Sequence, residues 1–188
     1  MMELYKRLNM KDMIAQSLYT LMLDKPFEKI TIKQITDKTG VIRGTFYNHF
    51  YDKYEALEYL AYMMLVKQYD DHIGDGDFIE VVDNIIKEID EHKAFIVKCF
   101  KVQGQNSFED MLNKIFRYIF DEYSKNHCVD FTGSPISKEL FLNTTANTIV
   151  YIIKQWIVEN KDYTYDEMCK IMEIIFTKSH KEILDELR

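Results

Sequence analysis

The stretch from Arg43 to His49 concentrates side chains that can bond to duplex DNA. The guanidinium of Arg43 can donate to O6 and N7 of one guanine, and the amide of Asn48 can bond an adenine edge. The hydroxyl of Thr45 can bond a base or a phosphate, and phosphate contacts supply most of the affinity for DNA. These residue types therefore indicate a nucleic-acid-reading segment in which Arg43 is the best candidate base reader.

The surrounding residues predict two short helices that would present this segment. Thr31 and Gln34 have the spacing of a capping box, which starts the first helix. Gly40 suits the end of that helix, because the residue after the last turn often takes a positive φ. A second helix must then fit between Val41 and Phe50. Two short helices joined by a glycine-containing turn are the signature of a helix-turn-helix.

Longer helices are predicted on both sides of this motif. Apolar residues recur at helical spacing from Asn9 to Leu23, and Asp52 caps a helix that runs from Lys53 to His72. The cluster Gly74–Asp77 is the clearest break in the chain. Beyond it, helices are expected over Phe78–Glu91, Lys93–Val102, Ser107–Asn126, Ser137–Lys161 and Tyr165–Leu187, with a loop at His127–Pro135.

The sequence thus predicts an all-α fold with an N-terminal three-helix helix-turn-helix head and a C-terminal helical bundle that dimerises. The head is expected over residues 1–52, with its motif at 31–50, and continues into a connecting helix over 53–72. Residues 73–188 are expected to form the C-terminal domain. The low content of turn formers, six Gly and two Pro in 188 residues, agrees with long helices.

Residues 31–50 resemble the DNA-binding motif of the TetR family, chiefly in the run Gly40-Val41, Gly44-Thr45-Phe46-Tyr47 and His49-Phe50. The likeness covers about the first 65 residues. Lys25-Pro26-Phe27 before Ile30-Thr31, and Gln155-Trp156-Ile157 before Tyr163-Thr164, are similar to the subgroup that includes dihydroxyacetone-kinase regulators. The resemblance implies a dimeric DNA-binding regulator with two equivalent heads and a near-palindromic operator. It also implies that Tyr47 and His49 occupy phosphate-clamping positions and that residues 73–188 form a ligand-binding and dimerisation domain.

Together, the motif and the resemblance give a candidate DNA-contacting set. Ile42 departs from the family pattern, in which Ser or Thr usually caps the recognition helix, and an apolar side chain here could touch a thymine methyl. Three alternatives stay open: Arg43 is merely solvated, Tyr47 packs inward, or His49 only covers Phe50. The set comprises Thr31, Lys33, Ile42, Arg43, Gly44, Thr45, Tyr47, Asn48, His49 and Lys53.

The C-terminal half is rich in large apolar residues, and the resemblance implies that they form a dimer interface and a ligand pocket. The alternative for the pocket set is an ordinary helical core. The expected interface comprises Ile149, Ile153, Trp156, Met168, Ile171, Met172, Ile175 and Phe176. The expected pocket comprises Met63, Met64, Phe95, Cys99, Phe100, Phe116, Tyr118, Phe120 and Tyr151, and its effector would be small and apolar or amphipathic.

Charge and composition bound the remaining function classes. The net charge is −7, but residues 1–60 sum to +1 and the rest to −8, which permits DNA binding through the head alone. Neither a signal peptide nor an apolar run long enough to span a membrane is visible, so we expect a cytoplasmic protein with no membrane partner. The three cysteines are too widely spaced to suggest a disulfide framework or a zinc site.

No enzyme motif, metal site or cofactor is predicted. His127-Cys128 and Asp130 carry ligand-type atoms but lack a second cluster. The leading hypothesis is a homodimeric repressor that a small-molecule effector releases from double-stranded DNA. The alternative is a helix-turn-helix-derived protein-interaction module, or an activator controlled by a protein partner.

Overall fold

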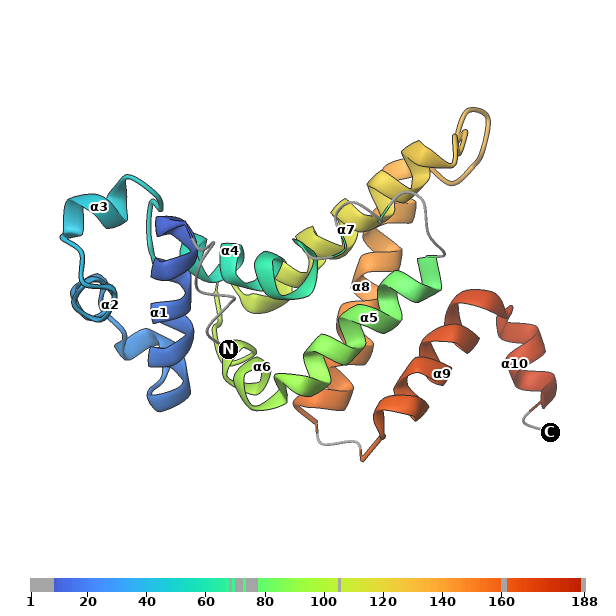
Figure 1. Cartoon of the computed structure of the whole chain (residues 1–188). Coiled ribbons are helices and arrows are strands. Elements are labelled where there is room, and N and C mark those ends of the chain that lie inside the picture. The colour runs from blue at the N-terminus through green and yellow to red at the C-terminus, as the bar shows by residue number, and fades with distance from the viewer. Residues whose placement is uncertain are drawn as a thin grey trace. The chain divides into compact units, whose positions relative to one another are not determined.

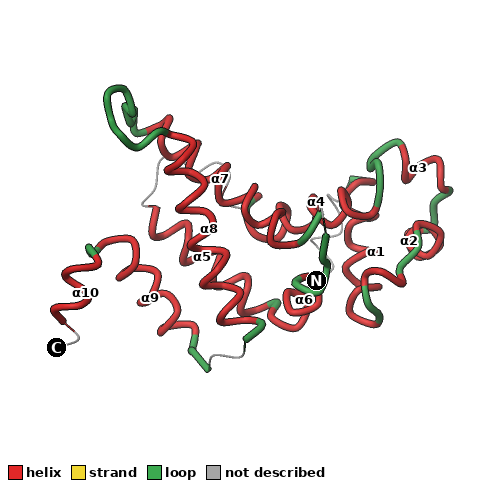
Figure 2. The backbone as a smooth tube through the Cα atoms, turned by 180° about the vertical axis from the view of Figure 1, so that it is seen from behind, coloured by secondary structure: helices red, strands yellow, loops and turns green. Residues whose placement is uncertain are grey.

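The computed structural model is all-helical over the residues that it describes, which are 9–67, 69, 73, 78–104, 106–159 and 162–186. Figure 1 shows the helices in chain order, and Figure 2 shows only helices and loops in this part of the chain. The predicted fold class is confirmed. The predicted break at Gly74–Asp77 lies outside the described residues.

The chain divides into two compact units. The head unit comprises Met1–Lys67 and Ala94–Leu112, and the body unit comprises Gln68–Lys93 and Asn113–Arg188. This division differs from the expected one because Ala94–Leu112 belongs with the head. Its contacts with α1 explain the difference: the Phe95 ring lies 4.6 Å from that of Tyr19, and Lys98 Nζ donates to the Leu23 carbonyl.

The head unit is built on α1, which packs against both α2 and α4. Ile14, Leu18 and Met22 recur at one-turn spacing along α1 and are fully buried. The capping box at Asn9 and Asp12 starts α1 in the same way as Thr31 and Gln34 start α2. The elements of this unit are α1 (Met10–Asp24), the 3₁₀ helix η2 (Phe27–Lys29), α2 (Ile32–Thr39), α3 (Arg43–Tyr47), α4 (Lys53–Leu65) and α6 (Lys93–Cys99).

The turn between α2 and α3 depends on Gly40, which ends α2 in the left-handed region with φ +79°. The amides of Gly40 and Val41 both donate to the Thr36 carbonyl, at 2.9 and 3.0 Å, so the turn closes on the last turn of α2. A side chain at position 40 would meet no atom within 4 Å, and the constraint there is therefore conformational and not steric.

The body unit contains α5 (Phe78–Glu91), α8 (Lys138–Ile157), α9 (Tyr165–Thr177) and α10 (His180–Glu186), with most of α7 (Phe108–Asn126). The helix predicted over Tyr165–Leu187 is wrong in one respect, because it is interrupted at Lys178. There the backbone is extended, and Ser179 forms a reciprocal cap with Glu182 that starts α10. Helix α4 ends at Leu65, earlier than the predicted His72.

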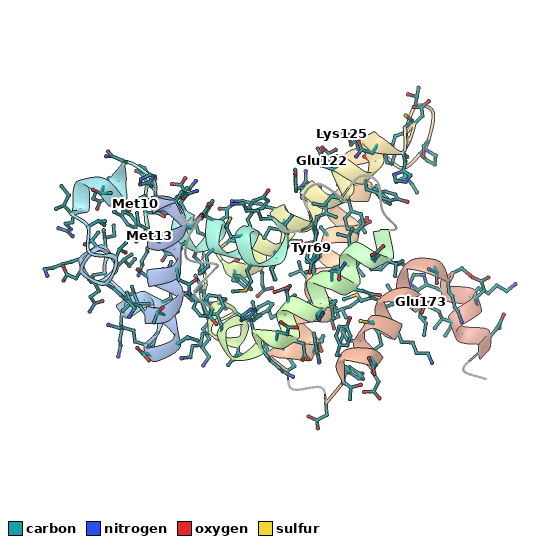
Figure 3. All side chains as sticks on the ribbon, viewed as in Figure 1. Met10, Met13, Tyr69, Glu122, Lys125 and Glu173 are labelled. Carbon is teal, nitrogen blue, oxygen red and sulfur yellow. The ribbon has the colours of Figure 1, made fainter. Side chains whose placement is uncertain are left out.

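Polar and aromatic contacts join the helices of the body. Arg117 of α7 pairs with Glu139 of α8 at 2.8 Å, and Lys138 pairs with Asp121 at 2.5 Å. The fully buried Trp156 donates from Nε1 to the Tyr163 carbonyl at 2.8 Å, which ties α8 to the segment before α9. Near the end of α7, the labelled side chains Glu122 and Lys125 form a surface pair at 2.7 Å (Figure 3).

None of the described helices is both long and apolar enough to cross a membrane.

The conformation of Gly40 leads to a stability prediction. Gly40→Ala should lower the free energy of unfolding by about 1–2 kcal/mol, because an L side chain disfavours the left-handed region. Urea denaturation followed by circular dichroism measures the change.

Gly44→Ala is the matched control, because a Cβ there would meet only Ile42 Cδ1 at 3.8 Å, an ordinary contact. Its stability should stay the same or rise by up to about 1 kcal/mol through helix propensity. Equal losses in the two variants would contradict the assignment of strain to Gly40.

Candidate nucleic-acid interface

Helix α3 and the residue before it present a continuous exposed row, which we call the recognition surface: Ile42, Arg43, Gly44, Tyr47 and Asn48. The row points outward because Phe46, the fourth residue of this five-residue helix, is fully buried on the side that faces the core. Tyr47 is 54% exposed, so it does not pack inward. Thr45 and His49 are half-buried at the edges of the row.

The start of α3 lacks a side-chain cap, as the departure at Ile42 predicts. Ile42 occupies the N-cap position, makes no side-chain hydrogen bond there and is 76% exposed. This exposure leaves an apolar group beside Arg43 that is available to another surface.

The first turn of α2 adds two exposed members of the predicted set, Thr31 and Lys33. The Thr31 hydroxyl is occupied as the helix cap, since it accepts from the Gln34 amide at 3.3 Å. Lys33 Nζ pairs with Asp37 at 2.6 Å, with both side chains more than half exposed. Pairs of this kind contribute at most about 1 kcal/mol, so Lys33 can exchange Asp37 for a phosphate at little cost.

Lys53 belongs to the predicted DNA-contacting set, but in the structure its ammonium is bonded inside the head unit. Its ammonium donates to the carbonyls of Phe27, Ile30 and Glu28, at 2.8, 3.0 and 3.3 Å. Desolvation lowers the pKa of Lys53, and the nearby carboxylates of Glu28 and Asp52 oppose that shift. The three carbonyls make Lys53 an internal contact of the head unit.

Tyr51 is an exposed residue that sequence reasoning missed. It is 85% exposed in the turn between α3 and α4, and its amide donates to Glu55 Oε2 at 2.5 Å. An aromatic residue between the buried Phe50 and the cap residue Asp52 is the signal that could have identified it. We add it to the candidates for contact with DNA.

The helices behind the recognition surface are joined by a polar contact as well as by apolar packing. Tyr59 of α4 donates to Asp12 of α1 at 2.6 Å, and Asp12 is only 8% exposed. Desolvation and this hydrogen bond raise the pKa of Tyr59 to about 12. Lys11 Nζ lies 4.3 Å from the Tyr59 ring centroid and 5.1 Å from that of Phe50. These contacts fix α1 and α4 together behind α3.

The predicted pocket set does not form one cluster within either unit. Met63, Met64, Phe95, Cys99 and Phe100 belong to the head, whereas Phe116, Tyr118, Phe120 and Tyr151 belong to the body. Tyr118 and Tyr151 lie on the surface, at 40% and 62% exposure. Tyr118 instead lines an open, charged groove of about 650 Å³ with Lys114, Arg117, Asp121, Ser137, Lys138, Glu139 and Leu142.

Most of the predicted interface set is buried within a single chain. Ile149, Ile153, Trp156, Met168 and Met172 are fully buried, so a second copy has no surface of theirs to cover. These five assignments to a dimer interface are therefore corrected to core. Ile171 and Phe176 are half-buried, and Ile175 is 41% exposed. These three can still contact a partner.

The cysteines are free thiols, and burial raises the pKa of Cys99 well above its usual range. In the described part of the chain, no group of three or more His, Cys, Asp or Glu side chains could hold a metal ion.

Two short helices, α2 and α3, joined by the tight turn at Gly40, form a helix-turn-helix, the motif of a large class of DNA-binding regulators. Known proteins agree with this class. The family TetR_C_8, described as a transcriptional regulator C-terminal region, matches residues 76–178, which is more than half of the chain. The chain belongs to the TetR family of transcriptional regulators.

Two relatives are similar over most of the chain. The HTH-type transcriptional regulator YvdT of Bacillus subtilis is 25% identical over 150 residues, which cover 75% of this chain and 77% of YvdT. The HTH-type dhaKLM operon transcriptional activator DhaS of Lactococcus lactis is 23% identical over 154 residues, covering 77% of this chain and 78% of DhaS.

Solved structures share the fold. Lin0861 from Listeria innocua superposes with a TM-score of 0.64 at 20% identity, covering 97% of each chain. The dihydroxyacetone kinase operon activator DhaS gives a TM-score of 0.60 at 20% identity, covering 89% of this chain and 92% of DhaS. The relatives are transcriptional regulators and not enzymes.

Proposed function

We propose that the chain is a homodimeric regulator that reads a near-palindromic operator through its recognition surface. The exposed row on α3 carries this proposal. Arg43 supplies a guanidinium that can bond guanine, while Ile42 offers an apolar contact and Tyr47 and Asn48 offer hydrogen bonds. Lys33 adds a cation at the start of α2 for a phosphate.

The reading role of Arg43 gives the main test. Arg43→Met should weaken binding to a duplex selected from a random library by the wild-type chain, by about tenfold or more. It should also relax base preference at one position of each half-site, because the lost contact is to a base edge. Fluorescence anisotropy measures the affinity, and repeated selection with the variant measures the preference.

Lys101→Met is the matched control, because Lys101 is an exposed cation of the head unit outside the recognition surface. It should bind the selected duplex within about twofold of the wild type, as expected for a side chain that touches no DNA. Equal losses in the two variants would show that Arg43 contributes only general positive charge, and the reading role would be abandoned.

Exposed apolar side chains on α8 and α9 support the dimer. Ile171 and Ile174 line a shallow groove of about 260 Å³ on α9 together with Tyr163, Glu167 and Lys170. Tyr151, which the sequence had placed in a pocket, is 62% exposed on α8. Burying such side chains against a second copy removes apolar surface from water. We assign the interface to these partly exposed side chains and to Ile175, which is 41% exposed on α9, in place of the buried residues.

The interface is tested at its most exposed isoleucine. Ile175→Asp should shift the chain toward monomer, raising the dimer dissociation constant by about tenfold or more, because a carboxylate would be buried without a partner. Sedimentation velocity measures the assembly state. DNA affinity should fall as well, because a monomer engages one half-site at a time.

Val129→Asp is the control for this change. It places the same carboxylate on a residue of similar exposure, 47%, in the loop after α7. Its assembly state should match that of the wild type. A wild-type chain that sediments as a monomer at every concentration would rule out the homodimer.

We propose repression relieved by a small effector as the first mode of regulation. A ligand releases DNA only if it binds the non-binding conformation more tightly, by about 10⁴-fold for a complete switch. Activation is the second candidate, favoured by the likeness to DhaS, which is described as an operon activator. In that mode a protein partner would take the place of the effector.

Transcription from a promoter that carries the selected duplex separates the two modes. A repressor should lower the basal transcript level several-fold, because the bound dimer competes with polymerase for the DNA. An activator should raise it. In vitro transcription with purified polymerase, with and without the chain, measures the sign of the effect, and Arg43→Met should reproduce it only at correspondingly higher protein concentration.

A further inference from the structure

Lys53, the first residue of α4, uses its whole donor capacity inside the head unit. An ammonium has three N–H donors. The Nζ atom lies within hydrogen-bonding distance of three carbonyl oxygens, at 2.8 Å from Phe27, 3.0 Å from Ile30 and 3.3 Å from Glu28. The same atom lies 4.4 Å from the Phe27 ring centroid, where a cation is attracted by the ring face.

The three carbonyls belong to η2 and the residue that ends it. The Phe27 carbonyl also accepts the Ile30 amide at 3.0 Å, and the ammonium is a second donor to it. A cation at the end of a helix can also satisfy carbonyls that have no partner within the helix. The next residue is Thr31, the cap from which α2 begins. Lys53 therefore fixes the backbone that sets where α2 starts, although it lies more than twenty residues later in the sequence.

The neighbouring contacts make this junction part of a larger attachment. Tyr54, the next residue of α4, packs edge-on against Phe27 with ring centroids 4.9 Å apart. One turn further along, Tyr59 bonds Asp12 of α1. The first half of α4 is thus joined both to α1 and to the segment leading into α2. A shift of α4 relative to α1 would change the distances between the Lys53 ammonium and the carbonyls of Phe27, Glu28 and Ile30.

We propose that Lys53 is a positioning residue that couples the start of α4 to the orientation of α2, and that it is not a phosphate ligand. A phosphate contact would require the ammonium to leave three carbonyls that have no other cation among their described contacts. This inference rests on the proposed function in one respect: it takes α2 and α3 to be the helices that approach DNA. The attachment itself exists in the DNA-free chain and can be measured there.

The test compares Lys53→Met, Lys53→Arg and Lys33→Met. Methionine keeps the aliphatic length but cannot donate, arginine restores donors and charge, and Lys33 is an exposed cation of α2 that holds no carbonyl. Hydrogen exchange is measured first on the DNA-free chains. Amides of residues 29–35 should exchange about tenfold faster in Lys53→Met, because opening this segment no longer breaks the three bonds.

In the same experiment, Lys53→Arg should return the rates to within about threefold of wild type, and Lys33→Met should leave them unchanged. Amides of α8 and α9 report whether each variant is folded. Faster exchange throughout the head unit in Lys53→Met, or no rescue by arginine, would reduce Lys53 to a general stability residue and overturn the proposal.

The second arm measures how the affinity for the selected duplex depends on salt. Affinity for DNA falls as salt rises, and each lost phosphate contact makes the plot of log affinity against log salt less steep by about 0.9. Lys53→Met should bind more weakly with the wild-type slope. A reduced slope together with unchanged exchange in the DNA-free chain would identify a phosphate ligand and overturn the proposal. If the wild type binds no duplex, the proposed function fails, while the exchange arm still decides the role of Lys53.

Discussion

The burial of Phe46 and Phe50 governs the geometry of the DNA-facing side. The two residues lie one helical turn apart, with ring centroids 5.8 Å apart, and both are inaccessible to solvent. Phe50 also meets Tyr59 of α4 and the ammonium of Lys11 on α1. With Phe46 directed into the core, Arg43 and Tyr47 lie on the adjoining face of α3 and are exposed. The polar row is exposed as a consequence of aromatic packing.

This constraint matters more here because α3 has little stability of its own. A five-residue helix with no side-chain cap is too short to persist without tertiary contacts. Its orientation therefore follows α1 and α4, which hold the aromatic cluster. The same dependence explains why the attachments of α4 at Lys53 and Tyr59 bear on DNA reading. Helix α4 contacts the aromatic cluster beneath α3 through Tyr59 and the segment before α2 through Lys53.

Signals confined to a few residues could be predicted from the sequence. The Thr31–Gln34 capping box, the left-handed Gly40 and the cap at Asp52 all involve partners within four residues, and each is present in the structure. The box at Ser179 and Glu182 has the same signature, but the apolar spacing on both sides of it suggested one continuous helix. The partners of Lys53 are 23 to 26 residues away, and local spacing carries no information about such contacts.

Periodicity identifies an apolar face, but it does not identify what covers that face. On α9, Met168 and Met172 form one stripe and Ile171 and Ile175 another, each at a spacing of four. The first stripe is buried within the chain, whereas Ile175 stays 41% exposed. One stripe of α9 thus belongs to the core of the body unit, and the other is only partly covered by the described part of the chain. The sequence shows that α9 has more apolar residues than one buried face needs. Only the packing shows that the methionines are buried and that the isoleucines are the residues left partly exposed.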